Sequence, residues 1–344
     1  MDYTEVLDSL GGIIEKDLTK QLDELRKQAN DYHPFLGNGY QAAEEFVLRG
    51  GRRLSSCTTL MVYKGYANEL NDGIIKASSG VELFRHSILV HDDIADIELQ
   101  RRGGKTMHRI FEEGYDEHFG AGTALFVGNT LYALAIESIL ESGFDHEKLT
   151  DVVSLFSSGF RDVNESQILD MLFEYKEPDV DEWRTMASKR AASLFRTSML
   201  TGAILAQAPE RDCKILEEAA MHIGYAFDIQ DDIIDTFASQ EQYGREPCGD
   251  ITKRKKPLHL ILALKKDRRL ASIMENGDWL RSEDILNIQD LIRRCGALDE
   301  AKSVSKYHAQ KAINLISETN MNNEAKDFFA SFIGYVAESL EWYK

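Results

Sequence analysis

The chain has 344 residues, of which 43% are apolar, and this is enough to bury a large core. The formal net charge of −18 at pH 7 argues against a nucleic-acid-binding protein and against a surface that binds anionic lipids, because both need a basic face. The four cysteines are scattered without a C-x-x-C spacing, so we expect neither a disulfide framework nor a zinc site, and a cytoplasmic location fits.

Helical spacing dominates the chain. Residues 1–16 are acidic and amphipathic and lack the basic start and apolar run of a signal peptide. No stretch approaches about 18 consecutive apolar residues, so no membrane span is expected. Period-two alternation is not convincing, and no Gly/Ser/Pro linker divides the chain. We therefore predict a single all-α domain over residues 1–344.

The first acidic cluster is a D-D-x-x-D pattern in apolar sequence, formed by Asp92, Asp93 and Asp96. On a helix the first and last of these carboxylates lie four residues apart and share a face. Three carboxylates this close repel one another, and burying them without a partner is costly, so a cation is expected beside them. Carboxylate oxygens without thiolates, and with little imidazole, suit Mg²⁺.

Several helix signals follow along the chain. Residues 123–140 are apolar nearly all round, which predicts a helix buried at the centre of the fold. Asp179 with Glu182 predicts a helix start with a reciprocal acidic cap. Ser282, followed by two acidic residues, predicts another start, and apolar spacing over 298–316 predicts one face of a helix.

A second D-D-x-x-D cluster, Asp231, Asp232 and Asp235, repeats the first. Two facing triads would hold several Mg²⁺ ions around one diphosphate. Two solvated helix faces are the alternative interpretation, which the repetition in apolar sequence disfavours. A carboxylate-bridged di-iron bundle needs Glu-x-x-His motifs, and none of the nine histidines has a glutamate three residues before it.

Basic residues accompany both clusters in this otherwise acidic chain. Guanidinium groups bind phosphate oxygens bidentately, and lysine acts as a point charge. Together with the triads, these groups indicate a site for more than one diphosphate. They are Arg52 and Arg53 after two glycines, Arg101 and Arg102 before Gly103, Lys189 with Arg190, and the run from Lys253 to Lys256.

In this order the motifs resemble those of the trans-isoprenyl diphosphate synthase (polyprenyl synthetase) family, over roughly residues 50–263. The resemblance is carried by Gly-Gly-Arg-Arg-Leu (50–54), His91–Asp96 through Arg101-Arg102-Gly103, Gln167 with Asp170, Lys189 with Leu194-Phe195, Gly224–Asp235, and Asp250 with Lys255.

The resemblance implies a bundle of long helices around a central cavity, and a homodimer. It implies about three Mg²⁺ ions per active site, between the two triads and an allylic prenyl diphosphate. Departure of the diphosphate would leave a carbocation, isopentenyl diphosphate would attack it, and a proton would be lost. The implied catalytic residues are Asp92, Asp93, Asp96, Lys189, Asp231, Asp232 and Asp235, with the six aspartates as metal ligands. The implied substrate-binding residues are Arg52, Arg53, Arg85, Arg101, Arg102, Gln167 and Lys255.

The sequence departs from the family pattern mainly on the isopentenyl side. The departures are Arg52 for lysine, Ser55 for arginine, Ser56 for proline, Arg85 for histidine, Arg190 for threonine, Asp228 for glutamine and Pro257 for threonine. The allylic half is close to intact, and the added arginines indicate a rearranged anion pocket. A prenyltransferase with a different acceptor, a class I terpene cyclase and a non-catalytic subunit of a hetero-oligomeric synthase are the alternatives.

Product length is a further expectation from the resemblance, because residues before the first triad form the floor of the family's product tunnel. Ser87, five residues before Asp92, is small, whereas Phe84, eight residues before it, is bulky. One helical turn is about 5.4 Å, similar to one extended isoprene unit. A floor at Phe84 predicts geranylgeranyl or geranylfarnesyl products.

Overall fold

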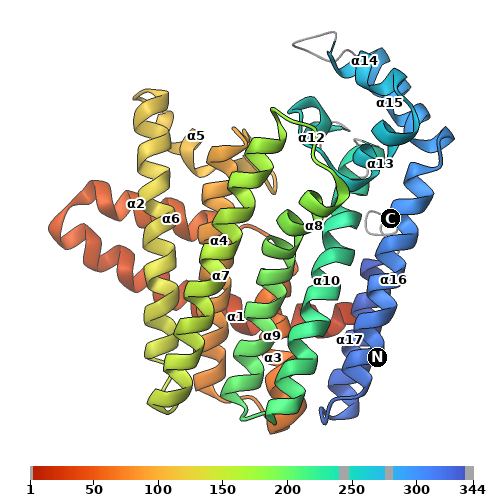
Figure 1. Cartoon of the computed structure of the whole chain (residues 1–344). Coiled ribbons are helices and arrows are strands. Elements are labelled where there is room, and N and C mark those ends of the chain that lie inside the picture. The colour runs from red at the N-terminus through yellow and green to blue at the C-terminus, as the bar shows by residue number, and fades with distance from the viewer. Residues whose placement is uncertain (1–2, 240–247, 276–281, 338–344) are drawn as a thin grey trace. The chain divides into compact units, whose positions relative to one another are not determined.

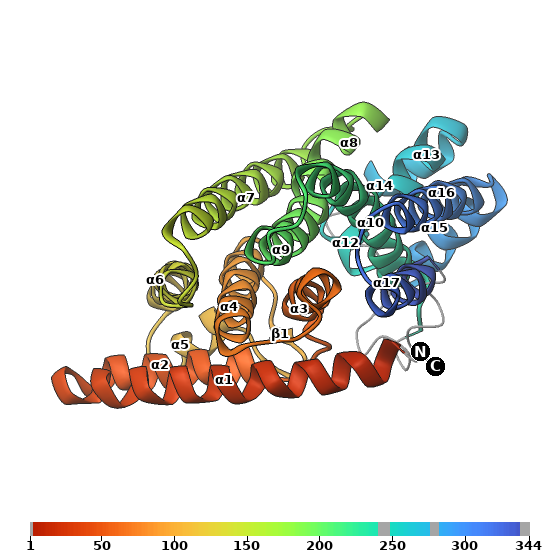
Figure 2. The same cartoon turned by 90° about the horizontal axis from the view of Figure 1, so that it is seen from below.

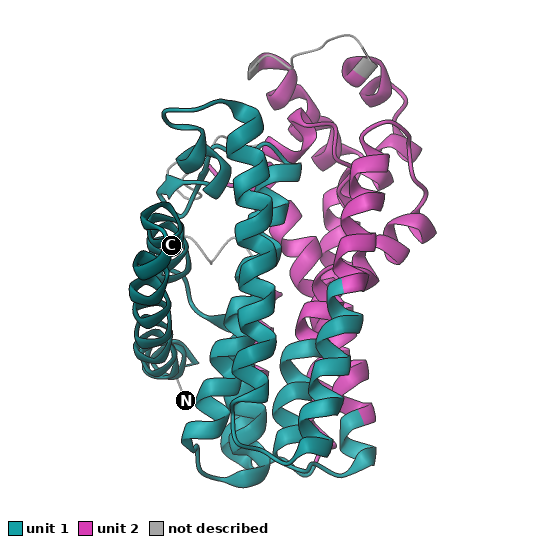
Figure 3. Ribbon diagram, turned by 90° about the vertical axis from the view of Figure 1, so that its left-hand side faces the viewer, with its two compact units in different colours: residues 1–160, 197–213, 320–328 teal, residues 161–196, 214–319, 329–344 magenta. Residues whose placement is uncertain are grey.

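The structure is a computed structural model that describes residues 3–239, 248–275 and 282–337 (Figure 1). Its contacts divide the chain into two compact units that alternate along the sequence (Figure 3). Unit 1 comprises residues 1–160, 197–213 and 320–328, and unit 2 comprises residues 161–196, 214–319 and 329–344. Each unit is described by itself, and the single domain over 1–344 stays a prediction.

Nearly every element is a helix, which confirms the all-α prediction. The early elements are α1 (Tyr3–Tyr32), α2 (Pro34–Leu48), α3 (Leu54–Ala67), α4 (Asp72–Ala95), β1 (Gln100–Arg101), β2 (Gly104–Lys105), α5 (Met107–Glu112), α6 (Glu117–Leu140) and α7 (His146–Phe173). The later ones are α8 (Val180–Lys189), α9 (Ala191–Leu205), α10 (Glu210–Phe237), α12 (Gly249–Thr252), α13 (Leu258–Lys266), α14 (Arg269–Glu275), α15 (Ser282–Arg294), α16 (Ala297–Ser317) and α17 (Asn323–Val336).

Unit 1 is built around α4. The helix begins at Asn71, whose side chain accepts a hydrogen bond from the backbone N–H of Ile74, and most of its residues are buried. Small residues let α6 approach it closely, because a Cβ at Gly80 would lie 2.8 Å from the carbonyl oxygen of Ala135. In Figure 2, α1 lies alongside α2 and runs across α3 and α4, which are seen nearly end-on.

Unit 2 packs α8, α10, α13, α15 and α16 around one apolar core. The predicted cap is confirmed: Asp179 accepts hydrogen bonds from the first turn of α8, and Glu182 accepts one from the backbone N–H of Asp179. The apolar face predicted over 298–316 is confirmed in α16, and α15 begins at Ser282 as predicted. The sequence also predicts a loop over residues 240–256; residues 240–247 lie outside the described residues, and 249–252 form the short helix α12.

The prediction that residues 123–140 form a helix buried all round is wrong. The helix exists as α6, but one of its faces is apolar and exposed, with Leu125 46%, Phe126 69% and Leu140 53% exposed. Among the described helices, α6 alone has the length and apolar composition to cross a membrane. Apolar composition alone does not tell which faces of a helix are buried. In unit 1, α6 packs against α4 with one face and leaves another face exposed.

Candidate active site

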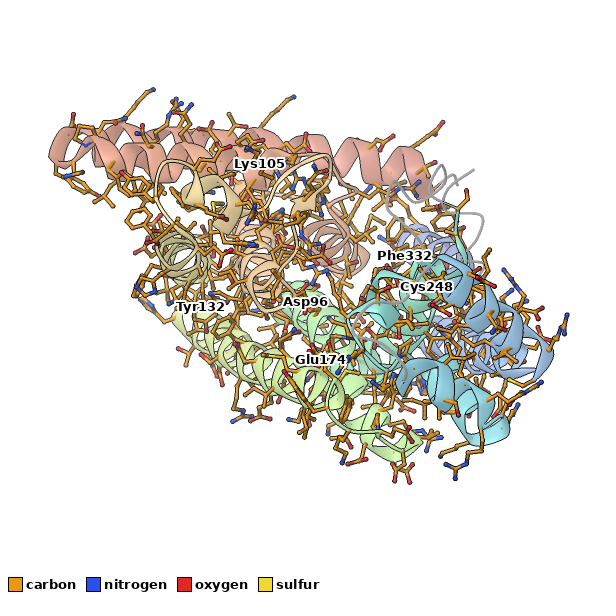
Figure 4. The ribbon with its side chains drawn as sticks, turned by 90° about the horizontal axis from the view of Figure 1, so that it is seen from above. Asp96, Lys105, Tyr132, Glu174, Cys248 and Phe332 are labelled. Atoms are coloured by element: carbon orange, nitrogen blue, oxygen red, sulfur yellow. The ribbon has the colours of Figure 1, made fainter. Side chains whose placement is uncertain are left out.

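The first triad lies at the C-terminal end of α4. Asp93 belongs to the last turn and is fully buried, whereas the side chain of Asp92 is 33% exposed. Asp96 follows the helix, and its backbone N–H still donates to the carbonyl oxygen of Asp92 at 2.8 Å, so the predicted i, i+4 relation holds. Figure 4 shows Asp96 at this end of α4.

A short hairpin, which the sequence analysis did not predict, places Arg101 against this triad. Strands β1 and β2 are joined through Arg102 and Gly103, whose φ values of 50° and 75° are the positive values that a type I′ turn requires. The Arg101 Nε and Nη2 atoms lie 2.7 and 2.6 Å from Asp93 Oδ1, and Nη2 lies 3.3 Å from Asp92 Oδ2. Burial raises the pKa of Asp93 to about 6, although the charge of Arg101 opposes this rise.

Arg49, also absent from the sequence prediction, holds this hairpin in place. Its Nη1 atom donates to the carbonyl oxygens of Arg101 (3.1 Å) and Lys105 (2.8 Å). A Cβ at position 104 would lie 2.3 Å from the Arg49 guanidinium carbon, so the close approach depends on Gly104. Figure 4 shows Lys105 on this hairpin.

Arg102 joins a buried polar cluster behind the turn. Its Nη1 atom donates to the carbonyl oxygen of Gly50 at 2.8 Å and lies 3.4 Å from His86 Nε2. Nδ1 of His86 lies 2.8 Å from the carbonyl oxygen of Glu82, which can only accept, so Nδ1 carries the proton and Nε2 accepts from Arg102. Burial lowers the pKa of His86 to about 4, and this imidazole is therefore neutral at pH 7.

Arg53, a predicted substrate-binding residue, lies in the core of unit 1. Its guanidinium donates to the carbonyl oxygen of Val47 (2.6 Å) and pairs with Glu82 (3.3 Å) and Glu15 (3.2 Å). Ser56, which replaces a family proline, donates to the same Glu82 carboxylate at 2.8 Å. Because the Arg53 side chain is only 1% exposed, we assign it a structural role.

The other predicted basic residues of this unit remain accessible. Arg52 is exposed, and its Nη1 atom lies 3.5 Å from the Tyr3 hydroxyl. Arg85 is half-buried on α4, and its charge contributes, with burial as the larger cause, to the lowered pKa of Arg102, about 10. Arg85 therefore adds positive charge near Arg102, and the rearranged anion pocket stays a prediction.

Phe84 and Ser87 are both buried on α4. The Phe84 ring centroid lies 4.9 Å from that of Phe156, 6.1 Å from that of Tyr132 and 6.3 Å from that of Phe160. Ser87 donates its hydroxyl hydrogen to the carbonyl oxygen of Phe84 at 2.9 Å. Phe84 thus belongs to an aromatic cluster. It lies about one helical turn from Ser87, a small residue whose hydroxyl group already has a hydrogen-bond partner.

The second triad lies on α10, in unit 2. Asp231 is exposed, whereas Asp232 and Asp235 are buried. Asp235 accepts a hydrogen bond from the backbone N–H of Asp250 at 3.0 Å and so holds the start of α12. Burial raises the pKa of Asp232 well above its usual value.

A guanidinium also lies beside this second triad. Arg190 Nε and Nη2 donate to the two carboxylate oxygens of Asp228 at 2.8 and 2.9 Å. The same side chain lies 3.7 Å from Asp232 and 3.7 Å from Asp170. At both positions the sequence departs from the family pattern, with Arg190 for threonine and Asp228 for glutamine. In the structure these two replacement residues form an ion pair with each other.

The predicted lysines of unit 2 both contact carboxylates of α7. Lys255 Nζ lies 2.9 Å from Asp170 Oδ2. Lys189 Nζ donates to Asp162 (3.0 Å) and Glu165 (2.6 Å), and these hydrogen bonds raise its pKa. The Lys189 ammonium group is therefore charged at pH 7. Gln167 is half-buried on the same helix.

The donor set fits Mg²⁺ in chemistry. Among the described residues, no group of three or more His, Cys, Asp or Glu side chains is arranged to hold a metal by itself. Mg²⁺ needs only one or two protein carboxylates, since water and phosphate complete its shell. Asp93 Oδ2 and Asp232 Oδ2 are buried and accept no hydrogen bond from the described residues, so each triad retains an oxygen for a cation.

Sequence reasoning also missed Glu82, which Arg53 and Ser56 both contact. An available signal was its position inside the apolar run Val81-Glu82-Leu83-Phe84, because a lone acid in a buried helix face requires a partner. His86 follows four residues later and shares its helix face. No local signal identified Arg49, whose partners lie 52 and 56 residues away.

Comparisons with known proteins show the family and the fold. The family model for polyprenyl synthetase matches residues 38–292. The short chain isoprenyl diphosphate synthase of Methanocaldococcus jannaschii is 30% identical over 82% of this chain and 84% of that protein. The geranylfarnesyl diphosphate synthase of Aeropyrum pernix is 27% identical over 87% of this chain and 94% of that protein.

Solved structures show the same fold. The geranylgeranyl pyrophosphate synthase of Corynebacterium glutamicum, complexed with isoprenyl diphosphate and magnesium, has a TM-score of 0.90 at 22% identity, over 98% of this chain and 100% of that one. The family match covers well over half of the chain. The chain therefore belongs to the polyprenyl synthetase family.

Proposed function

We propose that the protein condenses an allylic prenyl diphosphate with isopentenyl diphosphate to give a longer all-trans prenyl diphosphate, with geranylgeranyl or geranylfarnesyl diphosphate as product. The observation that carries this proposal is the pairing of a guanidinium with each triad, beside a buried carboxylate oxygen that no described residue contacts by a hydrogen bond. The named activities of the relatives from Methanocaldococcus jannaschii and Aeropyrum pernix support it.

Asp92, Asp93 and Asp96 in unit 1, and Asp231, Asp232 and Asp235 in unit 2, would hold Mg²⁺, about three ions per active site. When bound, Mg²⁺ would neutralise the diphosphate and stabilise it as a leaving group. The chain itself supplies fixed positive charge from Arg101, Lys189 and Lys255, which needs no reorganisation as the C–O bond breaks. Arg52, Arg85 and Arg102 would bind the diphosphate of the acceptor.

The aromatic cluster around Phe84 would hold the growing prenyl chain. Its rings are apolar apart from the Tyr132 hydroxyl, so they would keep water from the allylic carbon while its positive charge develops. The diphosphate leaves with the C–O electron pair, the double bond of isopentenyl diphosphate then forms the new C–C bond to the allylic carbon, and the departed diphosphate accepts the proton whose loss restores a double bond.

The test is incubation of the purified protein with Mg²⁺ and farnesyl diphosphate, with and without isopentenyl diphosphate. Products of 20 or 25 carbons that form only when both substrates are present are expected. Consumption of farnesyl diphosphate without isopentenyl diphosphate would instead establish a cyclase or a different acceptor. The replacements at Ser55 and Arg85 are the sequence features that favour this second candidate.

We also propose that the protein is a homodimer, which the exposed apolar face of α6 supports. Phe126→Glu on this face should shift the sedimentation coefficient to that of a monomer, because the charge would be buried between copies. Leu286→Glu, on an equally exposed residue of α15, is the matched control and should leave the dimer intact. A wild-type monomer, or an unchanged dimer in Phe126→Glu, would contradict the proposal.

The cysteines support the predicted cytoplasmic location. All four are thiols, and two of them, Cys57 and Cys248, are buried. Burial raises the pKa of Cys248 to about 12, so this thiol is unreactive toward oxidants at neutral pH.

A further inference from the structure

The ion pair with Asp228 fixes the orientation of the Arg190 guanidinium group by holding one of its edges. Asp228 occupies Nε and Nη2, at 2.8 and 2.9 Å, as a bidentate partner. Nη1 donates no hydrogen bond to any described residue, and its nearest carboxylate, Asp170, is 3.7 Å away. The N–H groups on this second edge are therefore available to another acceptor.

That second edge faces a small charged pocket in unit 2. The Arg190 side chain keeps 24% of its surface exposed, and Lys255, Lys256, Asp232 and Asp250 line the pocket with it. The pocket holds about 10 Å³, close to the room that one water molecule needs, so it suits a single ligand oxygen. Asp232, a residue of the second triad, lies 3.7 Å from the guanidinium, and its Oδ2 atom accepts no hydrogen bond from the residues that the structure describes.

The charges around the pocket indicate which ligand fits. Three carboxylates, Asp170, Asp232 and Asp250, match the three cations that line the pocket, so a bare anion gains no net attraction there. An anion that arrives with a divalent cation satisfies both groups, because the metal takes the free oxygen of Asp232 and the anion takes the N–H groups of Arg190. A diphosphate oxygen is an acceptor of the right size and charge for a guanidinium edge.

We propose that Arg190 is a diphosphate-binding residue, and that Asp228 is the positioning residue that orients it. The inference rests on the proposed function and adds a contact that the family's threonine and glutamine at these positions cannot provide. A structural role alone is the competing explanation, since removing one partner of a buried ion pair also destabilises the fold.

A pair of variants separates the two explanations. Arg190→Thr leaves Asp228 buried without a partner, so both thermal stability and the affinity for magnesium diphosphate should fall. The double variant Arg190→Thr/Asp228→Gln removes both charges and restores the family's residues, so its stability should recover. Its affinity should remain roughly 10- to 150-fold below wild type, because one charge-assisted contact is missing.

The measurements are calorimetric titration with inorganic diphosphate in the presence of Mg²⁺, and thermal unfolding of the same samples. Arg184→Thr, on the exposed side of α8, is the matched control and should change neither. A double variant with recovered stability and wild-type affinity would overturn this inference alone. A wild-type protein that does not bind magnesium diphosphate would overturn both the inference and the proposed function.

Discussion

At the scale of single residues, Arg52 and Arg53 show how neighbours in a motif come to differ. Arg53 has φ of 51°, a left-handed conformation just before α3, and this backbone turn directs its side chain into the core while Arg52 stays exposed. The sequence presents two equivalent basic residues after two glycines. Burial depends on the partners Glu15 and Glu82, which are distant in sequence, so the residues could not be separated beforehand.

Arg53→Met should therefore act on stability and Arg52→Met on binding. Removing Arg53 leaves Glu82 buried without its main counter-charge, and we expect the free energy of unfolding to fall by about 3–5 kcal/mol. Arg52→Met should leave stability unchanged and raise KM for isopentenyl diphosphate roughly 10- to 150-fold. Urea unfolding and steady-state kinetics check both expectations. If Arg53→Met raised KM without lowering stability, Arg53 would be a substrate-binding residue and the structural role would be wrong.

Substitutions at Phe84 and Ser87 should change the product length in opposite directions. Phe84→Ala removes a ring from the aromatic cluster and should lengthen the product by at least one isoprene unit. Ser87→Phe places a ring about one turn closer to the triad and should shorten it. Chromatography of the dephosphorylated products checks both, and an unchanged product length in the two variants would remove Phe84 from the tunnel floor.

At the scale of elements, the long helices were predictable and the hairpin was not. Periodic apolar spacing predicts α16, and the Asp179–Glu182 cap predicts the start of α8, because both signals are local. Strands of two residues carry no alternation, and arginine is an unusual residue in a type I′ turn. Five of the six triad aspartates lie within helices, and Asp96 caps the end of α4, but the hairpin that brings Arg101 to Asp93 has no comparable signal.

The turn of this hairpin should be sensitive to a single methyl group. Gly103 has φ of 75°, so Gly103→Ala introduces strain of about 1 kcal/mol, which displaces Arg101 from Asp93. We expect a five- to tenfold loss of kcat/KM for the allylic substrate, measured at saturating isopentenyl diphosphate. Gly12→Ala, within α1 and with no atom within 4 Å of the new Cβ, should leave this ratio unchanged. Equal effects in the two variants would contradict the role of the turn.

At the scale of the whole molecule, buried histidines predict how stability depends on pH. Burial lowers the pKa of His86 to about 4 and that of His259 to about 3, against about 6.5 in the unfolded chain. Between the folded-state and unfolded-state pKa values of these histidines, the unfolded chain binds more protons than the folded chain. The free energy of unfolding that the two neutral histidines contribute is therefore complete above pH 6.5 and is lost as the pH falls toward 4. Asp93, with its raised pKa, opposes this trend below pH 6.

His259→Gln should therefore weaken the pH dependence. Urea unfolding at pH 7 and pH 4.5 should show a difference smaller than wild type by roughly 2.5 kcal/mol, at about 1.4 kcal/mol for each pH unit between 6.5 and 4.5. His118→Gln, an exposed residue in α6, serves as the control and should match wild type. An identical pH dependence in His259→Gln would mean that His259 is not the neutral buried group described.

Two kinds of contact cannot be predicted from the sequence: contacts between separate protein chains, and contacts between residues far apart in one chain. An apolar segment such as α6 signals contact with something apolar, but not whether that surface belongs to the same chain. Arg190 and Asp228 are 38 residues apart on different elements, and each alone is only a departure from a motif. Their pairing becomes visible once the fold brings α8 and α10 together within unit 2.

The most direct test of the central claim is incorporation of labelled isopentenyl diphosphate. Purified protein with Mg²⁺ and an allylic diphosphate should transfer the label into a longer prenyl diphosphate, and Asp92→Asn and Asp231→Asn should each reduce the rate at least a hundredfold. Chelation of Mg²⁺ should abolish incorporation, and its restoration should recover it. No incorporation by a wild-type protein that still binds the allylic diphosphate would contradict the account and leave a different acceptor or cyclisation.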